Sequence, residues 1–403
     1  MGLFSKQRGC QYGAIVDIGS GSVLVAIVES SPHQDTPRII WSKRDYTVLR
    51  QIDSLGRSEK NVIAVLANAM MELSSAGMKT LWSEARQKRL STIQVTIVAP
   101  WSYTVTKTVS YKSEKEFTLS KEFVAELLEI SHQKVEEEVK ENEKIHKFGL
   151  ELIARMTAGL VVNGYNIRLT GKQNTKEVKL YELSAVAHER VVEAVTELSG
   201  KLFTRSDLKL YSFMLVFYTA MKDLQPDADE FCLVDITYEA TEIGIVRNGI
   251  LQYCSHIPYG AFSLAREFSE ILKIPLEEAF GLLSEGNLTS VLERYSDKQN
   301  REVIELLEAY QMRLADLFKE TGDKLSIPKQ VFLHGNIKNA VFFSDQVRKA
   351  TSKATGTSHL VKNITCDLLG RFASNNDKAE AEKVNQDTAM LLSAYFFHTH
   401  NRI

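Results

Sequence analysis

Cysteine is scarce in this sequence, with four residues among 403. No two of them form a C-x-x-C pair, so the spacing supports neither a structural zinc site nor a disulfide framework. Two of the four, Cys232 and Cys254, lie in apolar segments typical of buried strands. We therefore expect reduced thiols in a cytoplasmic protein, and neither zinc nor haem as a cofactor.

A surplus of charge and long apolar runs are also missing. Because 49 basic side chains meet 51 acidic ones, the net charge is −2, which gives no electrostatic reason to expect nucleic-acid binding. The longest apolar runs, residues 213–221 and 390–397, are much shorter than the roughly 20 residues that span a bilayer. Residues 1–6 carry neither the apolar core of a signal peptide nor a myristoylation pattern. These absences predict a cytoplasmic protein without a transmembrane segment.

What the sequence does contain is enough chain for more than one domain. A length of 403 residues exceeds what one ordinary hydrophobic core supports. Hydrophobic residues make up 44% of the chain and charged residues 25%, which is the balance of a globular protein. Two or more globular domains are therefore expected.

One strand pattern occurs twice. An apolar strand that ends in aspartate, a turn and a second strand run from Tyr12 to Glu29, and again from Phe231 to Val246. The two aspartates, Asp17 and Asp235, are 235 − 17 = 218 positions apart, which is far too long a period for a solenoid. The repeat instead predicts two duplicated lobes that face one cleft.

Residues 112–190 interrupt the first lobe. A helix capped near Ser120 is predicted first, and strand-like segments follow at residues 150–162, 166–170 and 177–187. One helix with several strands predicts a small α+β module inserted into this lobe.

Each aspartate-tipped turn suits phosphate chemistry. Backbone N–H groups of a tight turn can surround phosphate oxygens, and glycine lets the backbone approach closely. An aspartate at the end of the strand can hold Mg²⁺ through water. A single turn of this kind is more often a plain hairpin, and Asp235 by itself can be a strand-end cap. The functional interpretation therefore depends on two such turns in order.

Several segments resemble the actin, Hsp70 and sugar-kinase superfamily. Residues Ala14–Val23 resemble its first phosphate loop, Leu233–Ile245 the second, and Val331–Asn336 occupy the place of its adenosine motif. Ile257–Gly260, followed by a helix, is similar to the IPxGG segment of the FtsA and PilM families. The resemblance covers nearly the whole chain and implies an α/β, two-lobed actin/Hsp70-like (ribonuclease H-like) fold with an inserted α+β subdomain of the SHS2 type.

The resemblance also implies a domain division and a nucleotide site. The first lobe would comprise residues 1–100 and 188–226, with the inserted module at residues 101–187. The second lobe would comprise residues 227–273 and 329–403, with the helical outer subdomain at residues 274–328. The candidate nucleotide-binding residues are Asp17, Gly19, Ser20, Gly21, Ser22, Asp235, Thr241, Gly335 and Asn336. Asp17 and Asp235 would hold Mg²⁺ through water if nucleotide binds.

The second loop departs from the glycine-rich form of active relatives. It contains no glycine between Asp235 and Gly244, and Glu239 adds a negative charge that would face the phosphates. Residues that contact ribose and purine, and the first glycine of the adenosine motif, are replaced in the matching positions, at Phe280, Leu283 and His334. We therefore predict that ATP with Mg²⁺ binds weakly or not at all and that the chain is not an efficient ATPase. The alternative is a rearranged loop that still binds ATP without turnover.

The two families that share this architecture differ in their partners. PilM-like proteins bind a short cytoplasmic tail of a pilus membrane protein, such as PilN, in a cleft between the first lobe and the inserted module. FtsA-like proteins polymerise, bind the C-terminal tail of FtsZ, and attach to the membrane through an amphipathic helix after a linker. Here only residues 398–403 follow the last apolar helix. The preferred prediction is therefore a PilM-like scaffold of type IV pilus assembly, peripheral at the inner membrane through its partner.

Two alternatives stay open. One is an FtsA-like cell-division protein that self-associates into filaments and links the FtsZ ring to the membrane. The other, an active sugar or acetate kinase on the same fold, would need a catalytic acid and an intact second loop.

Overall fold

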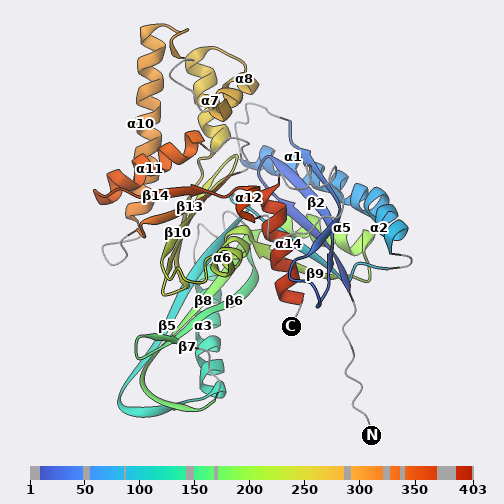
Figure 1. Cartoon of the computed structure of the whole chain (residues 1–403), viewed down its shortest axis with the longest axis vertical. Helices are drawn as coiled ribbons and strands as arrows, with labels where there is room; N and C mark the ends of the chain where they lie inside the picture. Colours follow the sequence, from blue (N-terminus) through green and yellow to red (C-terminus); the bar gives the residue numbers. More distant parts are fainter. Residues whose placement is uncertain are drawn as a thin grey trace. The chain divides into compact units, whose positions relative to one another are not determined.

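The chain is described by a computed structural model (Figure 1). The described residues are 10–48, 55–85, 88–141, 149–167, 171–285, 292–320, 327–335, 341–369 and 387–401. Contacts divide the chain into two compact units, which we call unit 1 and unit 2. They comprise residues 1–98, 191–211 and 364–403, and residues 99–190 and 212–363.

Unit 1 is built on one five-stranded sheet in the order β3-β2-β1-β4-β9. The strands are β1 (Gln11–Ile18), β2 (Ser22–Ser30), β3 (Arg38–Tyr46), β4 (Thr92–Ile97) and β9 (Asp207–Ser212). β1 is antiparallel to β2 and parallel to β4, and β2 is antiparallel to β3. β1 is buried along all but its first residue and β4 along its whole length, as expected of strands covered on both faces, although β4 alternates apolar residues with Thr92, Gln94 and Thr96.

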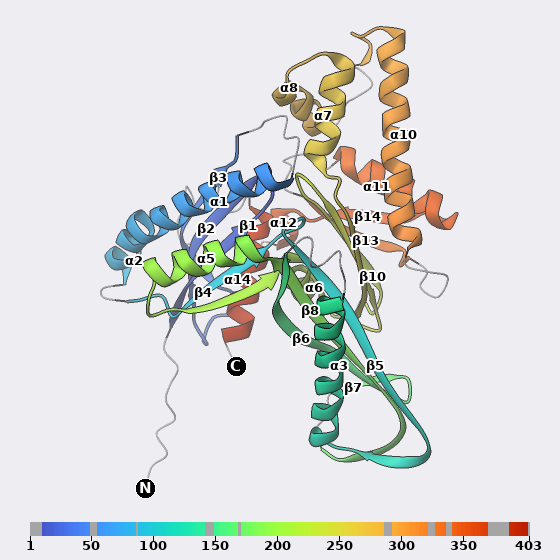
Figure 2. The ribbon, with the colours of Figure 1, turned by 180° about the vertical axis from the view of Figure 1, so that it is seen from behind.

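Helices cover both faces of this sheet. They are α1 (Leu55–Glu72), a π-helical turn (Leu73–Gly77), α2 (Met78–Glu84), α5 (Glu189–Leu202), α12 (Cys366–Leu369) and α14 (Thr388–Asn401). Figure 1 shows α14 in red on one face of the sheet, and Figure 2 shows α1 and α5 on the other. α1, the π-helical turn and α2 follow one another without a break and form one helical stretch.

The last helix, α14, packs in unit 1, whereas the division predicted from the sequence assigned it to the second lobe. Its Phe397 ring lies against Gly13 of β1, where an added Cβ would come within 2.2 Å of the ring. Gln94 of β4 donates a hydrogen bond to the carbonyl oxygen of Ser393 at 2.9 Å. A glycine in β1 and a buried amide in β4 therefore create the place that this helix fills.

Unit 2 repeats the strand order of unit 1 in a second sheet, β12-β11-β10-β13-β14. The strands are β10 (Phe231–Ile236), β11 (Thr241–Arg247), β12 (Ile250–Ile257), β13 (Gln330–Gly335) and β14 (Leu360–Asn363). β10 is antiparallel to β11 and parallel to β13, as β1 is to β2 and β4. The duplication predicted from the aspartate-tipped strands is therefore confirmed. Only β14, four residues long, had no sequence signal.

Several helices pack against the second sheet or against one another. They are α6 (Phe213–Leu224), α7 (Ala261–Leu272), α8 (Leu276–Glu285), α10 (Asp297–Lys319) and α11 (Val341–Thr355). α6 contacts β10 and β11, and so belongs to unit 2 rather than to the first lobe, where the sequence-based division placed it. α10 packs against α7 and α11. No helix in the described ranges combines the length and apolarity needed to cross a membrane.

Unit 2 also contains a four-stranded sheet, β5-β8-β6-β7. Its strands are β5 (Ser102–Leu119), β6 (Leu150–Val162), β7 (Tyr165–Ile167) and β8 (Gln173–His188), and helix α3 (Lys121–Glu141) covers it. Ser120 Oγ accepts a hydrogen bond from the Phe123 N–H at 3.3 Å, which is the predicted helix cap. A separate core that includes Val109, Leu127 and Leu180 fixes the helix on the sheet.

Candidate functional site

The first loop is the turn between β1 and β2, and it is compact. The Gly19 N–H donates to the Ser22 carbonyl at 2.9 Å, and the Gly21 carbonyl accepts from the Thr47 N–H at 2.9 Å. The turn residues and Asp17 are buried. The structure therefore brings together the five first-loop residues predicted from the sequence, Asp17, Gly19, Ser20, Gly21 and Ser22.

Asp17 faces a cation from its own chain. Arg44 of β3 places one guanidinium nitrogen 3.2 Å from Asp17 Oδ2 and another 2.8 Å from Ser22 Oγ. The same guanidinium holds both carboxylate oxygens of Asp387, at 2.6 and 3.0 Å. Burial alone would lower the pKa of Arg44, but Asp387 and Asp17 outweigh burial and raise it. The aspartate expected to hold Mg²⁺ is therefore neutralised internally.

The second loop, residues 237–240, closes onto the start of α7. The Ala261 N–H donates to the Thr237 carbonyl at 2.9 Å, and the Phe262 N–H donates to the Tyr238 carbonyl at 2.7 Å. The first N–H groups of a helix have no partner within the helix, which makes its N-terminus suitable for anions. In α7, two of these N–H groups already donate hydrogen bonds to carbonyl groups of the second loop.

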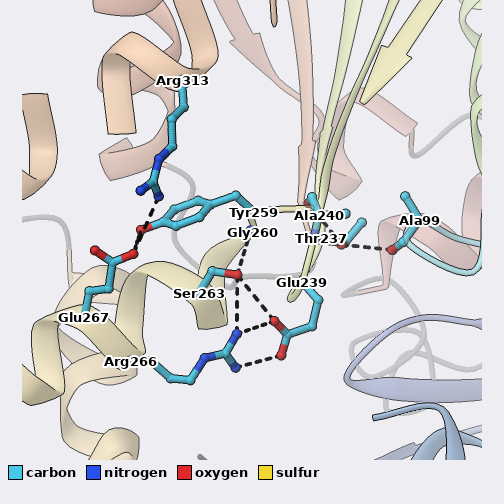
Figure 3. Close-up of polar contacts among 10 residues, drawn as sticks. All are labelled: Ala99, Thr237, Glu239, Ala240, Tyr259, Gly260, Ser263, Arg266, Glu267 and Arg313. Carbon is cyan, nitrogen blue, oxygen red and sulfur yellow. Dashed lines mark hydrogen bonds and ion pairs between the residues drawn. The ribbon is translucent and has the colours of Figure 1, made fainter. Parts of the chain in front are cut away.

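Glu239 of the second loop lies at the same helix N-terminus (Figure 3). Arg266 donates to both of its carboxylate oxygens, at 2.8 and 2.5 Å, and Ser263 Oγ donates at 3.3 Å. The hydrogen bond with Glu239 is the main cause of the raised pKa of Arg266. A carboxylate is favourable here because of the helix dipole. The position is therefore filled by an anion of the chain itself.

An aromatic cluster anchors the loop from its other side. The ring of Tyr238 lies 4.3 Å from that of Phe262, and Phe262 lies 4.8 Å from Phe280 (ring centroids). Tyr238 is buried, as is Leu283 on the same helix as Phe280. Two departures from the family pattern, one in the loop and one in α8, thus pack together.

Asp235, the second predicted Mg²⁺ ligand, is paired with His334. Parallel pairing of β10 and β13 places the two residues opposite each other. His334 Nδ1 lies 2.7 Å from Asp235 Oδ1, and both side chains are buried. The imidazole also lies against Phe213 of α6, with ring centroids 4.7 Å apart. The histidine that stands where the adenosine motif has its first glycine therefore contacts one carboxylate oxygen of Asp235.

Glu242 extends this buried polar row across β11. Strand pairing places it opposite Asp235 on one side and His256 of β12 on the other. Burial raises the pKa of Glu242 to about 8, the nearby Asp235 adds to this, and the Thr104 N–H at 3.2 Å opposes it. Burial also lowers the pKa of His256 to about 4.

The remaining predicted residues have structural partners or lie elsewhere. Thr241 Oγ1 donates to the Tyr259 carbonyl at 2.9 Å. Gly335 ends β13 opposite Ile236. Asn336 lies outside the described residues.

Sequence reasoning missed Arg44, Arg266 and Glu242. Glu242 had a usable signal, since it is an acid inside an apolar strand. Counting outward from the turn at residues 237–240 places it opposite Asp235. The two arginines had none, because their partners lie 343 and 27 positions away in the sequence.

As placed here, Asp17, Asp235 and Glu239 do not fit the binding of a magnesium ion and phosphates, because each already has a partner within the chain. Asp17 and Asp235 are engaged by Arg44 and His334. Glu239 brings a negative charge to the N-terminus of α7, a position that otherwise suits an anion. Using either aspartate as a ligand would require breaking its contact with Arg44 or His334, and separating a buried carboxylate from its partner is costly.

Replacing Gly260 by alanine is expected to destabilise the chain by about 1–3 kcal/mol, because an added Cβ has nowhere to go. It would lie 2.5 Å from the Thr237 carbonyl oxygen and 2.6 Å from the Ala240 nitrogen, both backbone atoms. Neighbouring Tyr259 cannot easily move aside, since its hydroxyl donates to Glu267 at 2.8 Å and Arg313 covers its ring (Figure 3). Urea unfolding measures the loss.

The matched control is Gly281→Ala in α8, where an added Cβ meets nothing within 4 Å. That change should stabilise the helix by about 0.5–1 kcal/mol. Equal effects of the two substitutions would show that the second loop does not pack tightly on Gly260.

No protein-family model and no curated protein matches the chain. Among solved structures it is similar to the "PilM-PilN type IV pilus biogenesis complex", at 14% identity and a TM-score of 0.58, over 96% of this chain and 98% of that chain. It is also similar to the ethanolamine utilization protein EutJ from Carboxydothermus hydrogenoformans, at 11% identity and a TM-score of 0.40, over 88% and 86%. The second score is too low to carry an argument.

At 14% identity this likeness bears on the fold alone. Two sheets with one strand order lead to the same conclusion independently. The predicted two-lobed actin-like fold, similar to that of PilM, is therefore confirmed.

Proposed function

We propose that this chain is a cytoplasmic actin-like scaffold of type IV pilus assembly. In this proposal it is recruited to the inner face of the membrane by binding the cytoplasmic tail of a PilN-like partner, and it does not turn over ATP. The solved PilM structure to which it is similar is a complex with PilN, and the similarity extends over 96% of this chain. The proposal extends that pairing to this chain.

The closed second loop is the observation that carries the proposal. Glu239 and Arg266 form a bidentate ion pair at the N-terminus of α7. The N–H groups of Ala261 and Phe262 donate hydrogen bonds to carbonyl groups of the second loop. A phosphate would have to displace a carboxylate that is already bound in a favourable place. A fold without room for phosphates at this loop supports binding of a partner, rather than catalysis, as the function.

Isothermal titration of the full chain with a synthetic cytoplasmic tail of a PilN-like protein from the same organism tests this role. We expect saturable binding that is the same with and without millimolar Mg-ATP, and no saturable heat from Mg-ATP alone. A tail of scrambled sequence and the C-terminal tail of FtsZ are the comparators.

Three results would contradict the proposal. They are no binding of the PilN-like tail, preferential binding of the FtsZ tail, and saturable Mg-ATP binding that Asp17→Ala abolishes. The second result would favour a cell-division role, and the third would mean that the loops rearrange around nucleotide.

A further inference from the structure

A groove of about 580 Å³ is lined by residues of α10 and α11 in unit 2, far along the chain from both loops. Figure 2 shows these two helices next to each other. Residues of one face of α10 form the apolar part of the groove, among them Ile304 and Leu307. Three cationic residues of α11, Arg348, Lys349 and Lys353, form its other wall. Apolar and basic surfaces therefore meet along two neighbouring helices.

The apolar part is not required by the protein core. α10 packs into the core through a neighbouring face that carries Val303, Tyr310 and Leu314. Ile304 is nevertheless 50% exposed, and Leu307, one turn further along, is half-buried. A single exposed isoleucine is ordinary in a globular protein, so the significance lies in the charges beside it.

The charges of the groove are predominantly positive. Lys349 and Lys353 are one helical turn apart and exposed, and within the described ranges neither forms an ion pair. Arg348 pairs with Asp345 at 2.9 Å, a surface contact of low energy. Glu308 is the single acidic residue that lines the groove. A chain with a net charge of −2 thus concentrates cations here.

The walls of the groove are fixed relative to each other. Gln311 of α10 donates to Gln346 Oε1 of α11 at 2.9 Å, and both side chains are buried. A buried hydrogen bond between the helices keeps the groove from closing. A ligand would therefore lose little binding energy to rearrangement of the protein.

We propose that this groove binds a short acidic segment of a partner protein. An aliphatic side chain of the segment packs on Ile304 and Leu307, and carboxylates beside it pair with Lys349 and Lys353. Charge complementarity selects this occupant, because two lysines that form no ion pair with any described carboxylate lie beside an exposed aliphatic surface. The proposal does not rest on the tail-binding role above and concerns a second partner.

Parallel selection of a displayed 12-residue peptide library tests the proposal, with the full chain and its K349E/K353E variant as targets. We expect peptides enriched only on the unchanged chain to be acidic and to contain an aliphatic residue. A synthetic copy of the strongest of them should bind the variant about 10-fold more weakly or worse. Both lysines are exposed, so the melting temperature of the variant should not change.

Matched controls separate the groove from general electrostatics. K172E/K176E, at two exposed lysines just before β8 and within it, makes the same charge change and should leave peptide affinity unchanged. Ile304→Ser should weaken binding, whereas Met312→Ser, 45% exposed on the same helix outside the groove, should not.

The proposal is overturned if both selections enrich the same peptides, or if the peptides specific to the unchanged chain are not acidic. Sedimentation velocity supplies a third test. If the chain self-associates and K349E/K353E abolishes this, the groove binds a second copy and not a different partner.

Discussion

Replacing Arg44 by alanine is expected to lower the free energy of unfolding of unit 1 by about 3–5 kcal/mol. The change leaves the carboxylate of Asp17, fully buried, and that of Asp387, 20% exposed, without their shared cation. Urea unfolding followed by tryptophan fluorescence measures the loss, because Trp41 and Trp82, two of the three tryptophans, lie in unit 1.

Arg38→Ala on the same strand is the matched control. Arg38 contacts Glu29 and Glu84 at 2.7 Å each, but these carboxylates keep 15% and 37% of their exposure. Neither carboxylate is fully buried as Asp17 is, so the expected loss is about 1 kcal/mol. The double variant D17N/R44M should recover part of the stability, because it removes charges from both sides. Equal losses for the two arginine variants would rule out the buried cluster as a major contribution.

Glu242→Gln is expected to remove a large pH dependence of stability. Burial raises the pKa of Glu242 to about 8 in the folded chain, against an ordinary value of 4.5. Between these values the folded chain holds a proton that the unfolded chain has lost. The free energy of unfolding therefore falls as the pH rises, by about 3 kcal/mol between pH 5 and pH 8. Glutamine cannot ionise, so the variant should lack this decline.

Urea unfolding at several pH values between 5 and 8 compares the two proteins. His256 acts in the opposite direction, because its pKa of about 4 makes the folded chain less stable as the pH falls below 6.5. It acts in both proteins, so their difference isolates Glu242. Glu197 is an exposed residue of α5, and its hydrogen bond with Lys201 lowers the pKa of its carboxyl group. Glu197→Gln should therefore leave the change of unfolding free energy with pH between 5 and 8 as it is. Parallel pH profiles for the unchanged chain and Glu242→Gln would refute the assignment.

Much of the fold could be predicted because its signals are local. The apolar strand that ends in Asp235, the turn after it and the second strand were predicted over Phe231–Val246, and β10 and β11 span Phe231–Arg247. The second-loop departures were also local, since absence of glycine between Asp235 and Gly244 is visible without coordinates. The closure of the second loop onto the start of α7 could not be predicted from that absence.

The site itself depends on pairings between distant segments. His334 meets Asp235 only because β13 lies parallel to β10 from 99 positions away. Arg44 reaches Asp387 across 343 positions, and sequence spacing carries no information about such a contact. The placement of α14 was missed for the same reason. Its apolar residues could pack on either sheet, and only the contacts with Gly13 and Gln94 show which sheet it covers.

The position of α14 also determines the order in which the protein can be completed during synthesis. The strands of the first sheet leave the ribosome early, yet one of their faces stays uncovered until residues 387–401 have been made. Unit 2, which ends at residue 363, has all of its parts by then. The half of the molecule that is translated first therefore reaches its final packing last, and a ribosome that stalls late leaves an apolar sheet face open to aggregation.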